Sequence, residues 1–121
     1  MKKRILIAED NPHLVHLMQK LLEFLGYDSI VANNGKEAVD FAAAHLPDLI
    51  ILDIALPKLS GLEAATLIRQ DPKTQSIPII AATATALPED KERCLQNSCD
   101  GYIAKPFTRD QLDSCIKNLL K

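Results

Sequence analysis

Short apolar runs alternate along the chain with longer segments in which apolar residues recur every three or four positions. The short runs fit buried strands, and the longer segments have the period of amphipathic helices. This alternation is typical of repeated strand-helix units that build a parallel sheet. The sequence predicts five such units, with strands at residues 4–8, 29–32, 49–52, 79–82 and 102–104.

The predicted helices begin and end at residues that suit helix termini. Asn11 followed by Pro12 provides an N-cap and a first-turn proline, and Gly26 ends the first helix. The remaining helices are expected after the turn Asn34-Gly35, over residues 62–70, from about Pro88, and after the N-cap Thr108. In the last helix, the inward-facing residues are predicted to be Leu112, Ile116, Leu119 and Leu120.

The pattern predicts that some strands are buried on both faces and that others lie at the edge of the sheet. Residues 49–52 form an unbroken apolar run, as expected of a central strand covered on both faces, whereas residues 29–32 fit an edge strand. A chain of 121 residues with 47% hydrophobic content can bury one core without disulfides or structural metal. We therefore expect a single α/β domain, a three-layer sandwich over residues 1–121 with no separate output domain.

Charge and cysteine content restrict the partners and the compartment. The formal net charge of -2 offers no field for nucleic acid or an anionic membrane, so a protein partner is expected. No apolar run approaches the roughly 20 residues of a membrane span, and neither a signal peptide nor an anchor is predicted. Cys94, Cys99 and Cys115 form no paired or metal-binding motif, and reduced, packed thiols indicate a cytoplasmic protein.

Five polar residues stand where four different predicted strands end. They are Glu9 and Asp10 after the first strand, Asp53 after the third, Thr83 after the fourth and Lys105 after the fifth. In an open parallel sheet, the carboxyl ends of the strands share one edge, and ligands bind in the crevice there. We therefore expect these residues to meet in one pocket.

The chemistry of this set favours phosphoryl transfer. Three crowded carboxylates repel one another unless they share a proton or bind a cation, and oxygen-only ligands favour Mg²⁺ or Mn²⁺. A bound cation, the Lys105 ammonium and the Thr83 hydroxyl would together stabilise the charge of a phosphoryl group. Asp53 is then the candidate nucleophile, because a carboxylate can form an acyl phosphate.

The sequence resembles the receiver domains of two-component response regulators, the CheY-like family, over its whole length. The resemblance rests on four motifs: residues 5–11 (ILIAEDN), residues 48–53 (DLIILD) continuing to Pro57 and Gly61, residues 82–84 (ATA) and residues 101–107 (GYIAKPF). It implies a flavodoxin-like fold of five strand-helix units, with a parallel sheet in the order 2-1-3-4-5. It also implies that Asp53 is the phosphoacceptor and Asp10 a direct metal ligand, while Glu9 binds the metal through water or orients it.

The same resemblance implies further roles and partners. Ala55 would offer its backbone carbonyl to the metal, Lys105 would pair with the phosphoryl group, and Pro106 would follow Lys105 through a cis peptide bond. Thr83 would move toward the phosphoryl group while Tyr102 changes rotamer, which alters the surface of the fourth helix, fifth strand and fifth helix. The implied donor is a histidine kinase or a histidine phosphotransfer protein, and a downstream protein reads the altered surface. Such a domain is a switch that catalyses only its own phosphorylation and dephosphorylation.

Some features depart from the family pattern or fit it less closely. Glu9 stands where many relatives have aspartate, and Ser98 where many have glycine. Ala55 and Thr85 are both small at the positions that govern water access to the acyl phosphate, so its lifetime is left open. His13, His16 and His45 lie outside the acidic set and are predicted to be solvated rather than part of a phosphorelay.

Other interpretations stay open beside a stand-alone signalling module. The chain could equally be the excised receiver of a hybrid histidine kinase or a transcriptional regulator. A flavodoxin-like cofactor binder and a metal-dependent phosphatase fit less well, since the first needs glycine and hydroxyl residues where Glu9-Asp10 stand and the second needs an Asp-x-Asp motif. A monomer is expected, with a dimer formed on phosphorylation as the alternative.

Overall fold

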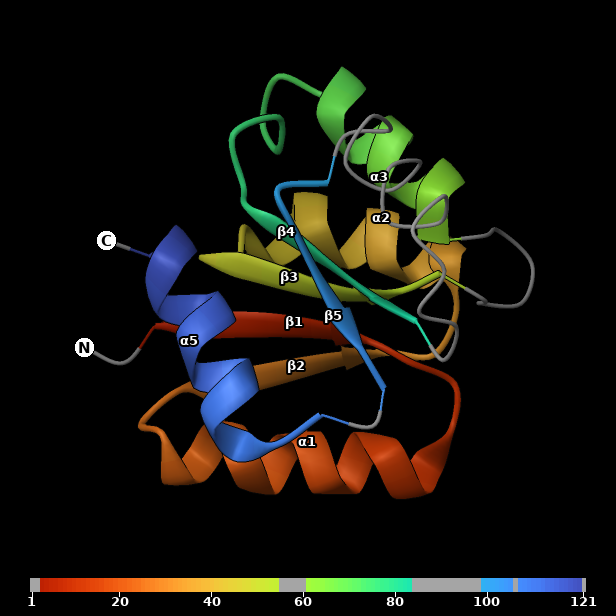
Figure 1. Cartoon of the computed structure of the whole chain (residues 1–121). Coiled ribbons are helices and arrows are strands. Elements are labelled where there is room, and N and C mark those ends of the chain that lie inside the picture. The colour runs from red at the N-terminus through yellow and green to blue at the C-terminus, as the bar shows by residue number, and fades with distance from the viewer. Residues whose placement is uncertain (1–2, 55–60, 84–98, 106, 121) are drawn as a thin grey trace.

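Five parallel strands form one sheet in the order β2-β1-β3-β4-β5, which confirms the predicted architecture (Figure 1). The computed structural model describes residues 3–54, 61–83, 99–105 and 107–120. All four strand pairings are parallel, and β3 lies between β1 and β4 as its apolar sequence predicts. The strands are β1 (Arg4–Ala8), β2 (Asp28–Ala32), β3 (Leu49–Asp53), β4 (Ile79–Thr83) and β5 (Gly101–Ala104).

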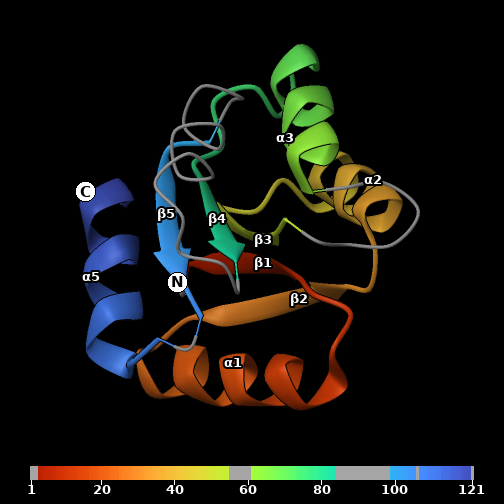
Figure 2. The same ribbon diagram turned by 45° about the vertical axis from the view of Figure 1, so that its right-hand side comes forward.

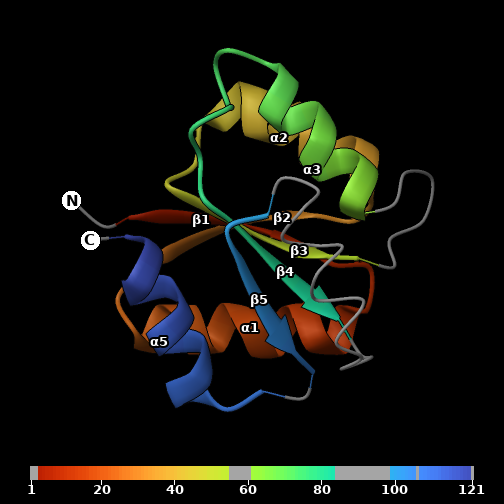
Figure 3. The same ribbon diagram turned by 45° about the horizontal axis from the view of Figure 1, so that its top comes forward.

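Helices cover both faces of this sheet in the described part of the chain. They are α1 (Pro12–Phe24), α2 (Gly35–His45), α3 (Gly61–Gln70) and α5 (Arg109–Leu119). The helices α1 and α5 lie on one face and α2 and α3 on the other, so the fold has three layers (Figures 2 and 3). The helix predicted from Pro88 and the departure at Ser98 lie outside the described residues. No helix that the structure describes is long and apolar enough to cross a bilayer.

Capping residues begin three of the helices, two of them, Asn11 and Thr108, as predicted and the third, Asn34, in the predicted turn. The Asn11 side chain accepts hydrogen bonds from the backbone N–H groups of His13 and Leu14, and Pro12 occupies the first turn of α1. Asn34 caps α2 by accepting from the backbone N–H of Glu37, and Thr108 forms a capping box with Gln111 at α5. These contacts satisfy N–H groups that have no partner inside the helix.

Strand alternation divides the core into two clusters, one on each face of the sheet. Ile7 of β1 and Ile51 of β3 point toward α1 and α5, where they pack with Met18 and Ile116. The neighbouring positions point the other way, and Leu6, Leu52 and Ala81 are among those that pack beneath α2 and α3. Successive strand residues face opposite sides, so the unbroken apolar sequence of β3 serves both clusters.

The last helix buries the residues that the sequence predicts, and the described cysteines are packed as predicted. Leu112 and Ile116 are fully buried, and Leu119 and Leu120 pack against the same cluster. Cys99 is buried and Cys115 is half-buried, while Cys94 lies outside the described residues.

Candidate functional site

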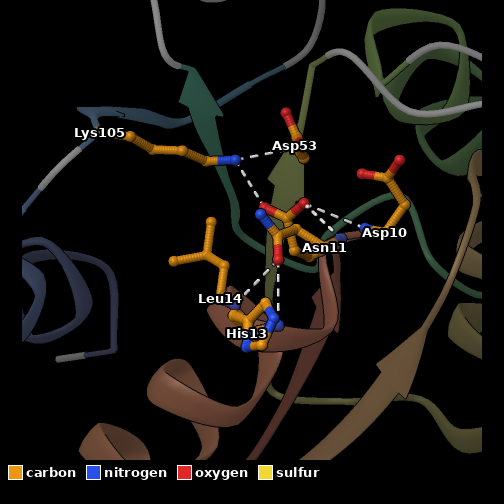
Figure 4. A network of polar contacts seen from close by, with 7 residues as sticks. Asp10, Asn11, His13, Leu14, Asp53 and Lys105 are labelled. Atoms are coloured by element: carbon orange, nitrogen blue, oxygen red, sulfur yellow. Dashed lines mark hydrogen bonds and ion pairs between the residues drawn. The ribbon is translucent and has the colours of Figure 1, made fainter.

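The turn between β1 and α1 presents two acids at the carboxyl edge of the sheet. Glu9 is 2% exposed, and its Oε2 accepts hydrogen bonds from the backbone N–H groups of Asp10 (3.0 Å) and Asn11 (3.2 Å). Asn11 in turn caps α1, so the two side chains hold the turn on either side of Asp10. Asp10 itself is exposed and follows directly on the buried strand. The local sequence thus fixes the backbone that carries Asp10 (Figure 4).

Asp53 is the last residue of the central strand and is 7% exposed. It pairs with Ala82 in the register of β3 and β4, and the next residue, Ile54, donates its N–H to the Ala82 carbonyl at 3.1 Å. The ladder therefore continues past the carboxylate. These backbone hydrogen bonds between β3 and β4 hold Asp53 at the centre of the sheet edge.

Lys105 reaches across the end of β4 to two of the acids. Its Nζ lies 2.5 Å from Glu9 Oε1 and 3.1 Å from Asp53 Oδ2. The backbone N–H of Lys105 donates to the Thr83 carbonyl at 2.7 Å, which keeps the start of its side chain beside β4. Figure 4 shows Lys105 extending toward Asp53 from one side, with Asp10 on the other side.

Side-chain alternation explains why these charges meet. Glu9, Asp53 and Lys105 each come two positions after a residue of the cluster beneath α1 and α5, namely Ile7, Ile51 and Ile103. Positions two apart on a strand point to the same face. The three ionic side chains therefore emerge on one side of the sheet edge.

The three acids are close enough to share a cation. Glu9, Asp10 and Asp53 each offer a carboxylate oxygen, and these oxygens all lie within 4.8 Å of one another. All are hard oxygen donors, two are buried and one is exposed, so a divalent ion would keep a side open to water and to a phosphate oxygen. The residues present thus fit Mg²⁺, as the donor chemistry predicts.

Burial and neighbouring charge shift the protonation of this group. Burial of the Glu9 carboxyl raises its pKa above the ordinary value, with Asp53 adding to the rise, although the Lys105 and Asn11 hydrogen bonds act the other way. Burial opposes charging of the Lys105 amine, yet the hydrogen bond to Glu9 and the charge of Asp53 raise its pKa above the ordinary value. Lys105 therefore stays an ammonium, whereas burial disfavours the charged form of Glu9.

Thr83 and Tyr102 lie on the opposite side of the sheet edge from the ionic group. Thr83 is a buried residue at the end of β4, two positions after Ala81 of the cluster beneath α2 and α3. Tyr102 is half-buried and packs against that same cluster, and it pairs with Ala81 in the register of β4 and β5. The two side chains therefore share one face of adjacent strands, with the small Ala81 beside them.

The structure brings together most of the residues that the sequence singles out. Glu9, Asp10, Asp53 and Lys105 form one cluster, and Thr83 ends the strand that lies between Asp53 and Lys105. Ala55, Thr85 and Pro106 lie outside the described residues. The three histidines are exposed, as predicted, and none belongs to the acidic group.

Sequence reasoning did not find two contacts that shape the site. The direct Glu9–Lys105 ion pair joins residues 96 positions apart, and no local pattern signals it. The close approach of Gly61 to the backbone of Asp53 is the other. A glycine at the start of a helix, eight positions after the strand-end acid, was the available signal for that contact.

Comparison with known proteins defines the class of this domain. The family model of the response regulator receiver domain matches residues 5–117. The chain therefore belongs to the response regulator receiver domain family, the receiving modules of two-component signalling.

Named relatives and solved structures agree with that class. The polar-differentiation response regulator DivK of Brucella anthropi is 42% identical over 120 residues, which cover 99% of this chain and 98% of the relative. The receiver domain of a sensor histidine kinase from Pseudomonas aeruginosa, solved with magnesium coordinated in its active-site cleft, is 37% identical with a TM-score of 0.93, and the match covers 99% of this chain and 98% of that one. The chemotaxis protein CheY4 of Vibrio cholerae is 25% identical with a TM-score of 0.92, over 99% and 100% of the two chains.

Proposed function

We propose that Asp53 accepts a phosphoryl group from a phosphohistidine donor, and that the domain thereby switches its surface for a protein partner. The observation that carries this proposal is the placement of Asp53. It is a buried carboxylate with the Lys105 ammonium at 3.1 Å and two further acids close by that can hold a cation. A carboxylate with only a structural role would need the Lys105 ammonium as its partner but not the two further acids.

The transfer is a substitution at phosphorus. An Asp53 oxygen attacks the phosphorus atom of the donor's phosphohistidine, and the phosphorus–nitrogen bond breaks. The ring nitrogen keeps the electron pair of that bond and takes up a proton from solvent, so the leaving group is neutral imidazole. The product on Asp53 is an acyl phosphate. A bound Mg²⁺ would supply charge neutralisation at the phosphoryl oxygens. Asp10, Asp53 and Glu9 would hold the ion, with the Ala55 carbonyl as the ligand that the family resemblance adds.

The remaining residues orient and read the phosphoryl group. Lys105 already faces Asp53 and would pair with a phosphoryl oxygen, which is a charge-assisted hydrogen bond in a partly buried site. The Thr83 hydroxyl would donate to another oxygen. Because Thr83 and Tyr102 share one face of adjacent strands, movement of Thr83 changes the space beside Tyr102 and so the surface of β5 and α5.

This chemistry indicates which proteins would donate the phosphoryl group and which would bind the phosphorylated domain. A histidine kinase or a histidine phosphotransfer protein would supply the phosphoryl group, and a downstream protein would bind the altered surface. The domain is thus a signalling switch whose only catalysis concerns its own phosphorylation.

The direct test uses a small phosphoryl donor. The protein is incubated with acetyl phosphate and MgCl₂, and intact mass is measured before and after; one added phosphoryl group is expected on the wild-type chain and none on Asp53→Asn. Asp48→Asn is the matched control, because Asp48 is an exposed acid at the opposite end of β3 and should label as the wild type does. Equal labelling of Asp53→Asn and wild type would refute the assignment.

A further inference from the structure

The Arg69 guanidinium joins the end of α3 to two later segments of the chain. Its Nη1 donates to the carbonyl oxygens of Gln75 at 2.7 Å and Ile77 at 2.6 Å, and its Nη2 pairs with the Asp100 carboxylate. The Arg69 side chain is 20% exposed, so these contacts form a partly buried joint. A guanidinium presents its donors in one rigid plane and can hold several acceptors in a fixed geometry, whereas the ammonium of lysine is a compact point charge.

Asp100 connects this joint to the strands β4 and β5. Its Oδ2 also accepts the backbone N–H of Ile79 at 2.9 Å, and its own N–H donates to the Ile79 carbonyl at 2.8 Å. Asp100 therefore continues the ladder between the two strands one residue ahead of β5, with its backbone and its side chain together. In the described sheet, β5 is a four-residue edge strand beside β4. The bonds at its two ends, through Asp100 and through the Lys105 N–H, thus make up much of its attachment.

Tyr102 lies two positions after Asp100, and side chains two positions apart along a strand point to the same face. The Tyr102 ring packs against the cluster beneath α2 and α3. That cluster includes Ile68, the residue before Arg69, and Ile77, whose carbonyl the guanidinium holds. The Arg69–Asp100 pair thus borders the cluster that surrounds Tyr102, and a sideways shift of β5 would change the space around the ring.

We propose that Arg69 and Asp100 are positioning residues, whose pair fixes β5 against β4 and α3 and thereby sets the environment of Tyr102. This inference rests on the proposed switch for its consequence in signalling, and it adds the contact that holds the switch strand in place. The pair lies at the opposite end of β5 from Lys105, away from the residues proposed to bind the cation and the phosphoryl group. If β5 is loosened there, Tyr102 gains further environments, and the surface of β5 and α5 changes without any change at Asp53.

The test follows the Tyr102 ring without any phosphoryl donor. The protein is labelled with fluorotyrosine and measured by ¹⁹F NMR, with Tyr27 as the internal control because it packs in the cluster on the other face of the sheet. In Arg69→Met, the Tyr102 signal is expected to move by more than its own linewidth or to broaden, while the Tyr27 signal keeps its position and width. Asp100→Asn keeps an oxygen for the Ile79 N–H but loses the charge that pairs with Arg69, and it should also change the Tyr102 signal.

Thr74→Val is the matched control for a merely structural role. The Thr74 hydroxyl is buried and donates to the Ile68 carbonyl at 2.6 Å, so it strengthens the same joint at the end of α3. The valine variant loses this hydrogen bond and leaves the Arg69–Asp100 pair in place. It should therefore be less stable than wild type in urea denaturation but keep the wild-type Tyr102 signal.

The outcomes separate this proposal from loss of stability and from the proposed phosphorylation. A wild-type Tyr102 signal in folded Arg69→Met overturns the proposal, and so does an equal change in Thr74→Val, since that would show a general effect of lost stability. If Arg69→Met does not fold, Arg69→Lys takes its place: it keeps the charge without the planar fork, and the same change of the Tyr102 signal is required. Because no phosphoryl donor is used, failure of Asp53 to label would refute the proposed function and leave this result as it is.

Discussion

Gly61 lies against the backbone of Asp53. A Cβ atom at Gly61 would collide with the Asp53 carbonyl oxygen and approach the Cα of Ile54 to 2.7 Å, which are rigid backbone atoms. The Gly61 N–H also donates to the Ile54 carbonyl at 2.9 Å. The start of α3 is thereby fitted onto the end of β3, and a hydrogen atom is the only substituent for which there is room.

Gly61→Ala is therefore expected to destabilise the domain and to slow labelling of Asp53. Overpacking against backbone costs about 1–3 kcal/mol, and the displaced strand end carries the phosphoacceptor. Urea denaturation and the rate of acetyl phosphate labelling measure the two effects. Gly101→Ala is the control, because its Cβ would make ordinary contacts of 3.4 and 3.5 Å with side-chain atoms, and its stability should stay within about 0.5 kcal/mol of wild type.

The arrangement of strands and the gathering of the acids could be predicted from sequence because both follow from local rules. The apolar run of β3 ends at Asp53, and Glu9 and Lys105 follow the ends of β1 and β5. Once the strands are parallel, their carboxyl ends share an edge. The predicted boundaries differ by one residue at several ends: β3 and β4 include Asp53 and Thr83, and β2 begins at Asp28.

Contacts that depend on loop geometry could not be predicted in this way. Arg69, in the last turn of α3, resembles a solvated basic residue that favours a helix C-terminus. Its guanidinium instead donates to the carbonyls of Gln75 and Ile77 and pairs with Asp100, which also accepts the N–H of Ile79. This clamp joins the loop before β4 to the residue before β5. Its partners are far apart in sequence, so no periodicity reveals it.

Leu46 is a further residue whose conformation could not be predicted from the sequence. It ends α2 in the left-handed conformation at φ 46°, where glycine or asparagine is the usual residue. Its side chain is 55% exposed. The helix must turn there toward β3, and this tertiary requirement outweighs the local preference that sequence rules use.

Stability of the metal-free domain should depend on pH through Glu9. The pKa of this carboxyl is raised above its ordinary value of 4.5 by burial, so the folded state holds the proton more tightly than the unfolded state does. The corresponding stabilisation is present below 4.5 and is lost as pH rises through the folded-state pKa. Wild type measured against Glu9→Gln should therefore lose stability as pH rises from about 4 toward 7.

Urea denaturation in EDTA over that pH range measures this difference. A repeat at high salt is the control, because screening weakens general charge repulsion much more than the interactions of a buried group. If the free energies of unfolding of wild type and Glu9→Gln change in parallel across this pH range, Glu9 has no such effect.

Magnesium should stabilise the folded domain, and Asp10 should be required for most of the effect. A ligand that binds only the folded state contributes about 2.7 kcal/mol at a concentration one hundred times its dissociation constant. Asp10 is the exposed member of the acid cluster, so Asp10→Asn removes a ligand with little loss of packing. Thermal unfolding with MgCl₂ and with EDTA measures the gain, and Asp28→Asn, an exposed acid at the start of β2, should retain it. Full retention by Asp10→Asn would contradict the metal assignment.

Thr83→Ala should separate phosphorylation from the change at Tyr102. Thr83 supplies neither the nucleophile nor one of the acids that can hold a cation, so the extent of acetyl phosphate labelling by mass should stay near the wild-type value. The hydroxyl that would draw Thr83 toward the phosphoryl group is missing, and Tyr102 should keep its unphosphorylated environment. Loss of the buried hydroxyl is expected to cost about 1 kcal/mol of stability.

Fluorotyrosine NMR reports the outcome directly, because Tyr27 and Tyr102 are the two tyrosines of the chain. Tyr27 packs in the cluster beneath α1 and α5, on the other face of the sheet from Tyr102, so its signal serves as an internal control. Phosphorylation should move the Tyr102 signal in the wild type and in Thr83→Ser, which keeps the hydroxyl, and leave it in place in Thr83→Ala. A full shift of the Tyr102 signal in labelled Thr83→Ala would mean that the two strand ends respond independently. The phosphoryl group would then reach the surface of β5 through Lys105, whose backbone is already bonded to β4.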